Sequence, residues 1–379
     1  MIKKKTWKYL AFIFEQTLPW LASFRRGNYG IGLLVMVIEG ANVFVLLRAH
    51  LLGKLEAVAK STEGVVGLLF LLFLTVALRL LARWGGWGGK GTQKGGEGTS
   101  HLRMALRRVG RNPKGIVGLL IPLCFIYLAF LAPFISSDPL TMHFMDRLKP
   151  PSSAHLFGTD KYGRGIFSRI IHGGRISLGI GASATFLNIL LGAVLGLLAG
   201  YYRGAVDAVI MRILEVANSI PFLVIAILVM AVFGSSIPML VLVLSVFALH
   251  PARIVRSQVL ELRENDYVQA ARALGAGGRQ IIFSHLLPNL LATLLIIGSI
   301  RVGKNILSLA GLSFLGLGVT PPTPSWGAML QEGRSLILRA PWIGIFPGIA
   351  IFLTVLSFNL LGDALRDALD PKLRVGVGE

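Results

Sequence analysis

The sequence predicts an all-α polytopic membrane protein, and three observations support this fold class. The 379 residues are 54% hydrophobic and only 15% charged, whereas a soluble domain has about a quarter charged residues. Apolar runs of about 20 residues, long enough to cross the hydrocarbon core as a helix, recur along the chain. The positive charge, +20 formally, clusters just outside these runs, as expected for Lys and Arg retained on the cytoplasmic side.

Eight such runs are predicted to be transmembrane helices. They lie at residues 30–47, 64–81, 115–135, 176–200, 210–233, 238–254, 286–307 and 343–361. The first two belong to an N-terminal extension, residues 1–83. The remaining six form a separate core, so the chain is predicted to have six core spans and two extra N-terminal ones.

Residues 84–100, WGGWGGKGTQKGGEGTS, connect the extension to the core. Glycine at this density predicts a flexible linker. The GGKGT motif does not fit a phosphate-binding loop, because that spacing requires Gly at Trp84 and Ser or Thr at Gly91. The chain also has no H-E-x-x-H motif and no Cys/His cluster. We therefore expect it to bind no nucleotide, other cofactor or metal itself.

Basic segments predict the orientation of the core. Residues 101–115, HLRMALRRVGRNPKG, precede the first core span, and the Arg-bearing residues 253–279 lie between the fourth and fifth. A six-span path brings both segments to the same side, which we predict to be the cytoplasmic one. No nucleic-acid motif or aromatic-interleaved basic patch accompanies them, so no nucleic-acid partner is predicted.

The segment DYVQAARALGAGGRQIIFSHLLPN, residues 266–289, interrupts the apolar pattern between two spans. Its first part consists of good helix formers with small side chains, and Gly275 can end that helix in the left-handed conformation. A second helix is predicted to start around Arg279 and to carry Pro288 early in the next span. The pattern alone fits either a surface helix that a partner approaches closely or an ordinary loop with a helical turn.

This segment resembles the E-A-A loop of ABC importer permeases, a helix-Gly-helix that docks into a groove of the ATPase subunit. The segments at 155–181, 312–334 and 340–374 resemble the dipeptide/oligopeptide/nickel permease family, specifically its C-type subunit. The resemblance covers about residues 101–374, which leaves a tail at 375–379. It assigns ATPase coupling to these positions: Tyr267, Gln269, Ala270, Ala271, Gly275 and Pro288.

The resemblance implies a six-helix ABC importer permease core that forms half of a translocation pathway for peptides in the bacterial cytoplasmic (inner) membrane. It implies a second permease subunit in a heterodimer, two cytoplasmic ATPase subunits and an extracytoplasmic substrate-binding protein. ATP and Mg would bind to the ATPases, so the chain itself is not expected to be an enzyme. Nickel chelates or another small solute remain open as substrates, because selection in this family rests largely with the binding protein.

Four positions depart from the family pattern. Gln269 replaces the usual Glu, which removes a charge but keeps hydrogen-bonding ability. Leu309 and Gly311 stand where Glu and a small polar residue are frequent, and Gly165 replaces the Asp that usually follows GR. These differences leave room for a divergent substrate or partner.

Two cations are predicted inside the fifth core span. Arg301 and Lys304 lie three residues apart on one helix face, in the outer half of the predicted span. Charges at membrane depth are costly and often functional. They are predicted to line the translocation pathway and attract a substrate carboxylate, to extend to the outer headgroups, or to pair with an acidic loop residue.

Gly192, Gly196 and Gly200 place small residues on one face of the second core span. This spacing predicts close helix packing, with a pore-lining strip as the alternative. A different class of protein, a self-sufficient secondary transporter, would be expected to show inverted repeats or intramembrane carboxylates. Neither feature is evident in the core.

Overall fold

The structure is a computed structural model, and it describes residues 108–110, 112–246 and 249–369. The predicted spans at 30–47 and 64–81, the linker at 84–100 and the tail at 375–379 lie outside these residues. The described part is helical, and its only β-type pairing is an isolated bridge between Thr159 and Gly165. The predicted all-α class is therefore confirmed.

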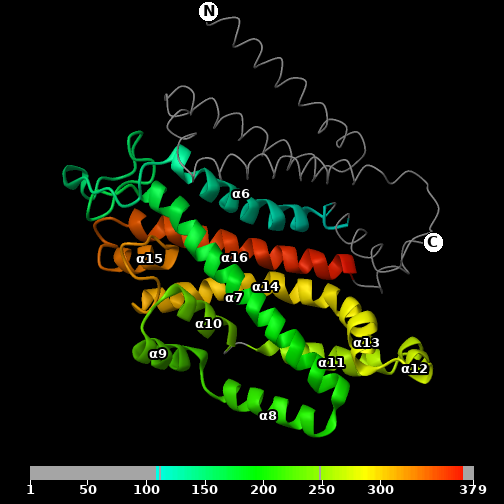
Figure 1. Cartoon of the computed structure of the whole chain (residues 1–379). Helices are drawn as coiled ribbons and strands as arrows, with labels where there is room; N and C mark the ends of the chain where they lie inside the picture. Colours follow the sequence, from blue (N-terminus) through cyan, green and yellow to red (C-terminus); the bar gives the residue numbers. More distant parts are fainter. Residues whose placement is uncertain (1–107, 111, 247–248, 370–379) are drawn as a thin grey trace, which may run out of the picture.

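Five helical segments of the described part are long and apolar enough to cross a membrane. Figure 1 shows them side by side in one bundle. They are α6 (Pro113–Ile135), α7 (Ile166–Tyr202), α10 (Ile237–Val246) with α11 (His250–Arg263), the segment Gly278–Phe314, and α16 (Trp342–Leu369). The segment Gly278–Phe314 consists of α13 (Gly278–Gln280), the π-helical η2 (Ile281–Leu286) and α14 (Leu287–Phe314).

The third core span is broken, so the prediction of one continuous helix over 210–233 is wrong. The structure has α8 (Gly204–Ser219) and α9 (Phe222–Phe233), bent by 84° at the break. Pro221 explains the break, because a proline disfavours helical geometry in the residue before it, and Ile220 is extended. Counted as one span, the bent pair brings the total to the predicted six.

Several helices extend beyond the predicted hydrophobic runs. α7 begins at Ile166 rather than at residue 176, and α14 ends at Phe314 rather than at residue 307. Apolar composition detects only the part of a helix that faces lipid or core, whereas the backbone continues through polar turns until a cap ends it. The extra turns at the start of α7 carry Arg169, which belongs to the charged cluster described below.

Glycines let α7 pack tightly on α11. A Cβ at Gly196 would lie 2.6 Å from the Ala252 carbonyl oxygen, and one at Gly192 or Gly200 would lie 2.7 Å from a side chain of α11. All three glycines are buried. The predicted packing role is confirmed within the chain, and the pore-lining alternative is wrong.

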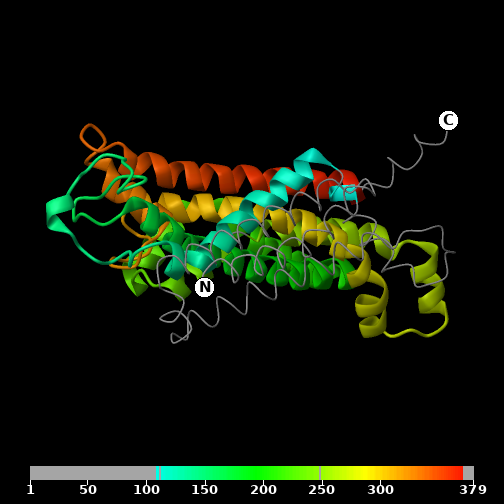
Figure 2. The same cartoon turned by 90° about the horizontal axis from the view of Figure 1, so that it is seen from above.

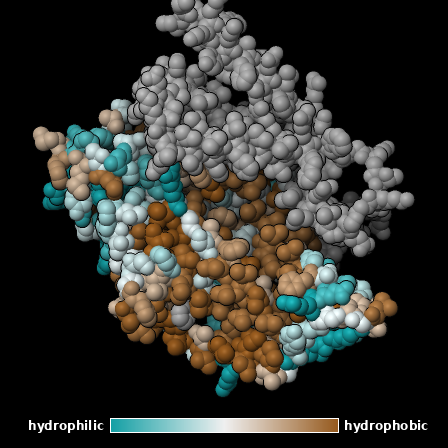
Figure 3. Space-filling model, in the orientation of Figure 1, coloured by the Kyte–Doolittle hydropathy of each residue, from teal (hydrophilic) through white to brown (hydrophobic). Residues whose placement is uncertain are grey.

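The two ends of the bundle carry different short helices. In Figures 1 and 2, α12 (Asp266–Ala273) lies at one end, and the connection between α6 and α7 lies at the other, together with α15 (Trp326–Arg334). Figure 3 shows apolar residues gathered over the middle of the visible face and hydrophilic residues toward both ends. This distribution is expected for a bundle whose helices span a membrane.

Candidate functional site

The α12 helix presents a small and partly apolar face. Val268 is its buried residue. Tyr267 and Ala270 are exposed, and Leu274, just past the last helical residue, is 89% exposed. Because these three positions follow a helical spacing of three and four residues, they share one face. We call Tyr267, Ala270 and Leu274 the α12 face.

Gly275 ends the helix as the sequence predicts. Its φ of +86° is left-handed. The Ala276 N–H donates to the Ala271 carbonyl at 3.0 Å, a bond that spans five residues and is typical of a glycine-terminated helix. Ala271 is half-buried beside this turn. The turn therefore fixes the direction in which the chain leaves α12.

The chain then enters the membrane through a π-helical turn that the sequence analysis did not predict. In η2 the Leu287 N–H donates to the Ile282 carbonyl, five residues back. Pro288 follows directly, and it has no N–H for the Ser284 carbonyl, which its ring would also crowd in a regular helix. A widened turn accommodates both effects. Pro288 was the available signal, although a proline alone predicts a kink rather than a π turn.

Gln269 binds its own chain. Its side-chain Nε2 donates to the Arg263 carbonyl at the end of α11, at 3.0 Å. Arg263 in turn donates from Nη1 to the Tyr201 carbonyl at 2.7 Å. A Glu at position 269 could not donate to that carbonyl. The departure from the family pattern thus has a structural consequence, which is a tether between α12 and α11.

Further contacts connect α12 to α7 and to the start of α14. The Arg272 guanidinium lies 5.9 Å from the Tyr201 ring centroid, within cation–π range. The Asn289 side chain donates to the Tyr267 hydroxyl at 3.4 Å and to the His285 carbonyl at 2.6 Å. Tyr267, Gln269 and Pro288, which are predicted to couple to the ATPase, therefore lie in one connected region, whereas Ala270 is exposed on the surface.

Arg301 and Lys304 lie near the middle of α14, further from its outer end than the sequence predicts. Lys304 is exposed and Arg301 is half-buried, and neither forms an ion pair within the described part of the chain. Between Lys304 and Phe314 the helix rises about 15 Å, further than a lysine side chain reaches. Lys304 therefore does not reach the end of α14 at Phe314.

The Lys304 face of α14 is open. Gly311 lies seven residues later on the same face, and a Cβ there would have no neighbour within 4 Å. Leu309, by contrast, is buried against Leu312 and Val319. The two departures from the family pattern therefore lie in different environments. Leu309 is a core residue, whereas Gly311 lies on an uncovered face of α14 and adds no side chain to it.

A buried cluster of four charges at the other end was not predicted. Arg169 in α7 donates to Asp160 at 2.8 Å and to Glu332 in α15 at 2.7 and 3.1 Å. Arg164 donates to Asp160 at 2.6 Å and to Glu332 at 3.3 Å. Asp160 and Arg169 are each 1% exposed. Asp160, Arg164, Arg169 and Glu332, here called the four-charge cluster, balance one another and bind α15 to α7.

Comparisons with known proteins agree with this architecture. The model of the binding-protein-dependent transport system inner membrane component matches residues 192–375, and that of the N-terminal TM domain of oligopeptide transport permease C matches residues 100–151. The glutathione transport system permease protein GsiD of Pectobacterium atrosepticum is 46% identical over 271 residues, 71% of this chain and 90% of that protein.

A second relative is the dipeptide transport system permease protein DppC of Alkalihalophilus pseudofirmus, 42% identical over 274 residues, 72% of this chain and 90% of that protein. GsiD of Escherichia coli O6:K15:H31 is 44% identical over 271 residues, 71% of this chain and 89% of that protein. Identity at this level over nearly the whole relative confirms the predicted family. The chain belongs to the binding-protein-dependent transport system inner membrane components, as a C-type permease subunit of an ABC importer of the dipeptide and oligopeptide class.

Proposed function

We propose that this permease forms half of a translocation pathway for short peptides, including anionic ones such as glutathione, in the bacterial inner membrane. Its partners would be a related permease in a heterodimer, two cytoplasmic ATPases that bind ATP and Mg, and an extracytoplasmic binding protein. The observation that carries the proposal is the exposed α12 face, which a short turn at residues 274–277 connects to α13, η2 and the cation-bearing α14.

The α12 face would be the docking surface for an ATPase. Leu274 is 89% exposed, and burying this apolar side chain against a partner would be favourable. Ala270 beside it leaves room for close approach. Gln269 already binds the Arg263 carbonyl, so the contact would depend on packing more than on an ion pair at position 269.

Movement of α12 would pass to the pathway through α14. The tethers from Gln269 to α11 and from Asn289 to Tyr267 hold α12 to two membrane helices. The π turn η2 is the point at which the helix can change its path, because π turns interrupt the regular bond ladder. A rigid helix on either side of such a point converts docking motion into an alternating-access movement.

Arg301 and Lys304 would act inside the pathway. Both lie on α14 without a carboxylate partner among the described residues, and Lys304 faces outward from this chain. A positive charge in a site with little water attracts a peptide carboxylate more strongly than it would in bulk solvent. Related proteins are named for glutathione and dipeptide transport. We therefore favour peptides over nickel chelates as the substrate. Membership of this family also argues against a self-sufficient secondary transporter.

The test uses the complete transporter in proteoliposomes. Ala270→Glu places a charge on the α12 face and should reduce both co-purification of the ATPases and substrate-stimulated ATP hydrolysis by about tenfold or more. Ala205→Glu is the matched control, because Ala205 is exposed on α8, close to the end of α7 that contacts α12. Gly275 is a poorer test site, since its φ of +86° adds strain to any substitution. Normal stimulation of Ala270→Glu would contradict the docking role.

A further inference from the structure

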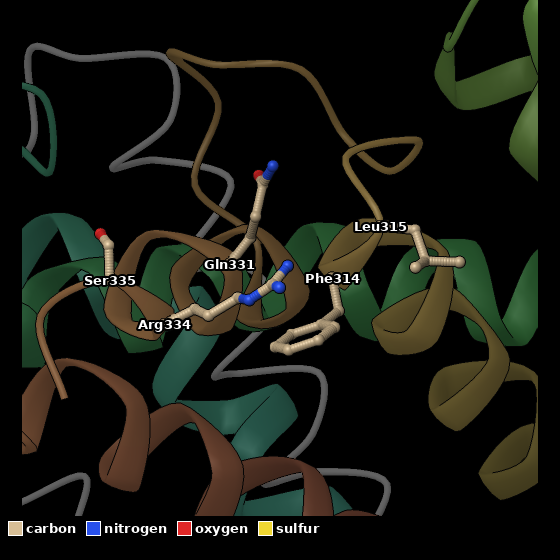
Figure 4. A pocket seen from close by; sticks show the side chains of 5 residues that line it. All are labelled: Phe314, Leu315, Gln331, Arg334 and Ser335. Atoms are coloured by element: carbon tan, nitrogen blue, oxygen red, sulfur yellow. The ribbon is translucent and has the colours of Figure 1, made fainter.

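An open hollow lies beside α15, at the end of the bundle opposite α12. One part, of about 500 Å³, is lined by Phe314, Leu315, Gln331, Arg334 and Ser335 (Figure 4). A second part, of about 540 Å³, shares Gln331 and Ser335 and extends toward Lys161. We call the two adjoining parts the α15 hollow.

Two cations of the hollow have no carboxylate partner among the described residues. Arg334 lies 5.2 Å from the Phe314 ring centroid, and Lys161 lies 5.0 Å from the ring of Tyr162. The other charged side chains lining the hollow, Arg164 and Glu332, already neutralise each other within the four-charge cluster. The hollow therefore carries an excess of positive charge.

The lining also offers uncharged hydrogen-bond donors. Figure 4 shows Gln331 pointing away from α15 and the Arg334 side chain running toward Phe314. The Gln331 amide and the Ser335 hydroxyl are both exposed there. A guanidinium, an amide N–H and a hydroxyl are groups that donate to carboxylate oxygens. Leu315 and Phe314 add apolar surface for the remainder of a small peptide.

The helix that carries these donors is held firmly. Ser325 caps α15 by accepting from the Ala328 N–H, and the Trp326 N–H donates to Ser177 of α7 at 3.1 Å. The Trp326 indole donates to the Ile170 carbonyl at 2.9 Å. Glu332 adds the ion pairs with α7. Because the helix is already fixed, binding would not have to order its backbone.

The hollow opens onto the uncovered side of α14. Leu315, which lines it, lies four residues after Gly311 and eleven after Lys304, positions that share one helix face. The distance along the axis from Lys304 to Leu315 is about 16 Å. Arg334 and Lys304 thus form two separate cationic positions along one open surface, from the end of the bundle toward its middle.

We propose that the α15 hollow is a first binding subsite for anionic peptides, with Arg334 contacting a peptide carboxylate before it reaches Lys304. The proposal rests on the proposed function, since it requires that peptides pass this face of α14. It adds a specific residue and a substrate preference, namely peptides with more carboxylates than amino groups.

The test measures charge in the hollow directly. Ser335→Cys is made in a Cys124→Ala background of the complete transporter, and its reaction rates with anionic sulfonatoethyl and cationic trimethylammonioethyl methanethiosulfonate are compared. Ser153→Cys, exposed in the connection between α6 and α7 but outside the hollow, is the reference. The anionic-to-cationic rate ratio at Ser335→Cys should exceed the reference about fivefold, as expected for a unit charge within several ångströms.

Adding Arg334→Gln should return that ratio to near the reference, whereas Arg334→Lys should retain most of it. Arg339→Gln, at an exposed arginine outside the hollow, should leave it unchanged. The dipeptide Ala-Glu should also slow labelling of Ser335→Cys at least threefold more than Ala-Lys does.

A ratio that does not respond to Arg334→Gln would overturn the proposal, as would equal protection by the two dipeptides. Complete lack of labelling at Ser335→Cys would overturn it too, because a partner subunit would then cover the hollow. Labelling needs no ATP turnover, so these outcomes are separate from a failure of ATPase coupling at α12, which would contradict the proposed function instead.

Discussion

Each end of this permease carries a short helix outside the membrane spans, and the two helices are attached in different ways. At one end α15 buries Trp326, Ala328 and Met329 and is bound to α7 by the four-charge cluster. At the other end α12 buries Val268 and presents Leu274 to solvent. The chain therefore fixes α15 to its own spans through buried contacts, whereas most of the α12 surface is exposed.

The ion pairs that hold α15 are buried, whereas one pair near α12 is exposed. Arg169 and Asp160 are almost fully buried at the α15 end. Near α12, the pair between Arg203 and Glu264 is 2.9 Å long with side chains 45% and 56% exposed. Exposed pairs contribute little to stability, whereas breaking a buried one is costly. The pairs that hold α15 are therefore expected to contribute more to stability than the Arg203–Glu264 pair does.

The largest expected effect comes from breaking the four-charge cluster. Arg169→Met leaves Asp160 and Glu332 in a buried site with only Arg164 to balance them. We expect the free energy of unfolding to fall by about 3–5 kcal/mol, measured by denaturant titration of the purified permease in detergent. Arg212→Met is the control, since its pair with Glu215 has side chains 80% and 55% exposed. A loss below about 1 kcal/mol at Arg169 would remove the contrast between the ends.

A smaller effect is expected where α7 connects the two ends. Gly196→Ala would bring a methyl group within 2.6 Å of the Ala252 carbonyl and of Val255 in α11. Overpacking of this kind costs about 1–3 kcal/mol. Gly179→Ala, on the same helix with no atom within 4 Å of its Cβ, should instead be neutral or stabilising. Equal unfolding midpoints for the two variants would argue against tight contact between α7 and α11.

The sequence predicted features that local chemistry determines. Hydrophobic length located the spans, the Gly192–Gly200 spacing predicted close packing, and Gly275 predicted the end of α12. It did not reveal the four-charge cluster, because Arg169 and Glu332 are 163 residues apart and meet only through the packing of α7 and α15. The bend at Pro221 and the π turn before Pro288 were missed for a related reason: a proline indicates where a helix is disturbed but not in which direction it continues.

Restoring the family's usual residue at the start of α7 should stabilise the α15 end further. Gly165 is the N-cap of α7, makes no side-chain capping bond and has open space around it. An Asp there would accept hydrogen bonds from free N–H groups, and its negative charge would interact favourably with the positive end of the helix dipole. The Arg169 Nε, buried without a hydrogen-bond partner, lies one turn further on. Gly165→Asp should therefore raise the free energy of unfolding by about 0.5–1 kcal/mol.

Gly165→Ala separates the cap from a general effect of adding a side chain, because Ala provides no acceptor. It should give no gain, or a small loss. If Gly165→Ala stabilised the permease as much as Gly165→Asp, reduced freedom of the unfolded chain, and not capping, would explain the result.

The smallest effect is expected at Gln269, where the α12 end is tethered. Gln269→Glu removes the donor to the Arg263 carbonyl, but both groups are near water, which can replace the bond. The free energy of unfolding should fall by less than about 1 kcal/mol.

The freed carboxylate at position 269 would turn toward solvent, where the ATPase could contact it. Stimulated ATP hydrolysis should therefore be retained, and it should become more sensitive to salt than in the parent protein. Gln269→Ala loses the same tether without adding a charge, so its ATPase activity should keep the parent's salt dependence. If both variants lost coupling equally, the tether to α11 itself, rather than the α12 face, would be the part of this end that transmits ATPase motion.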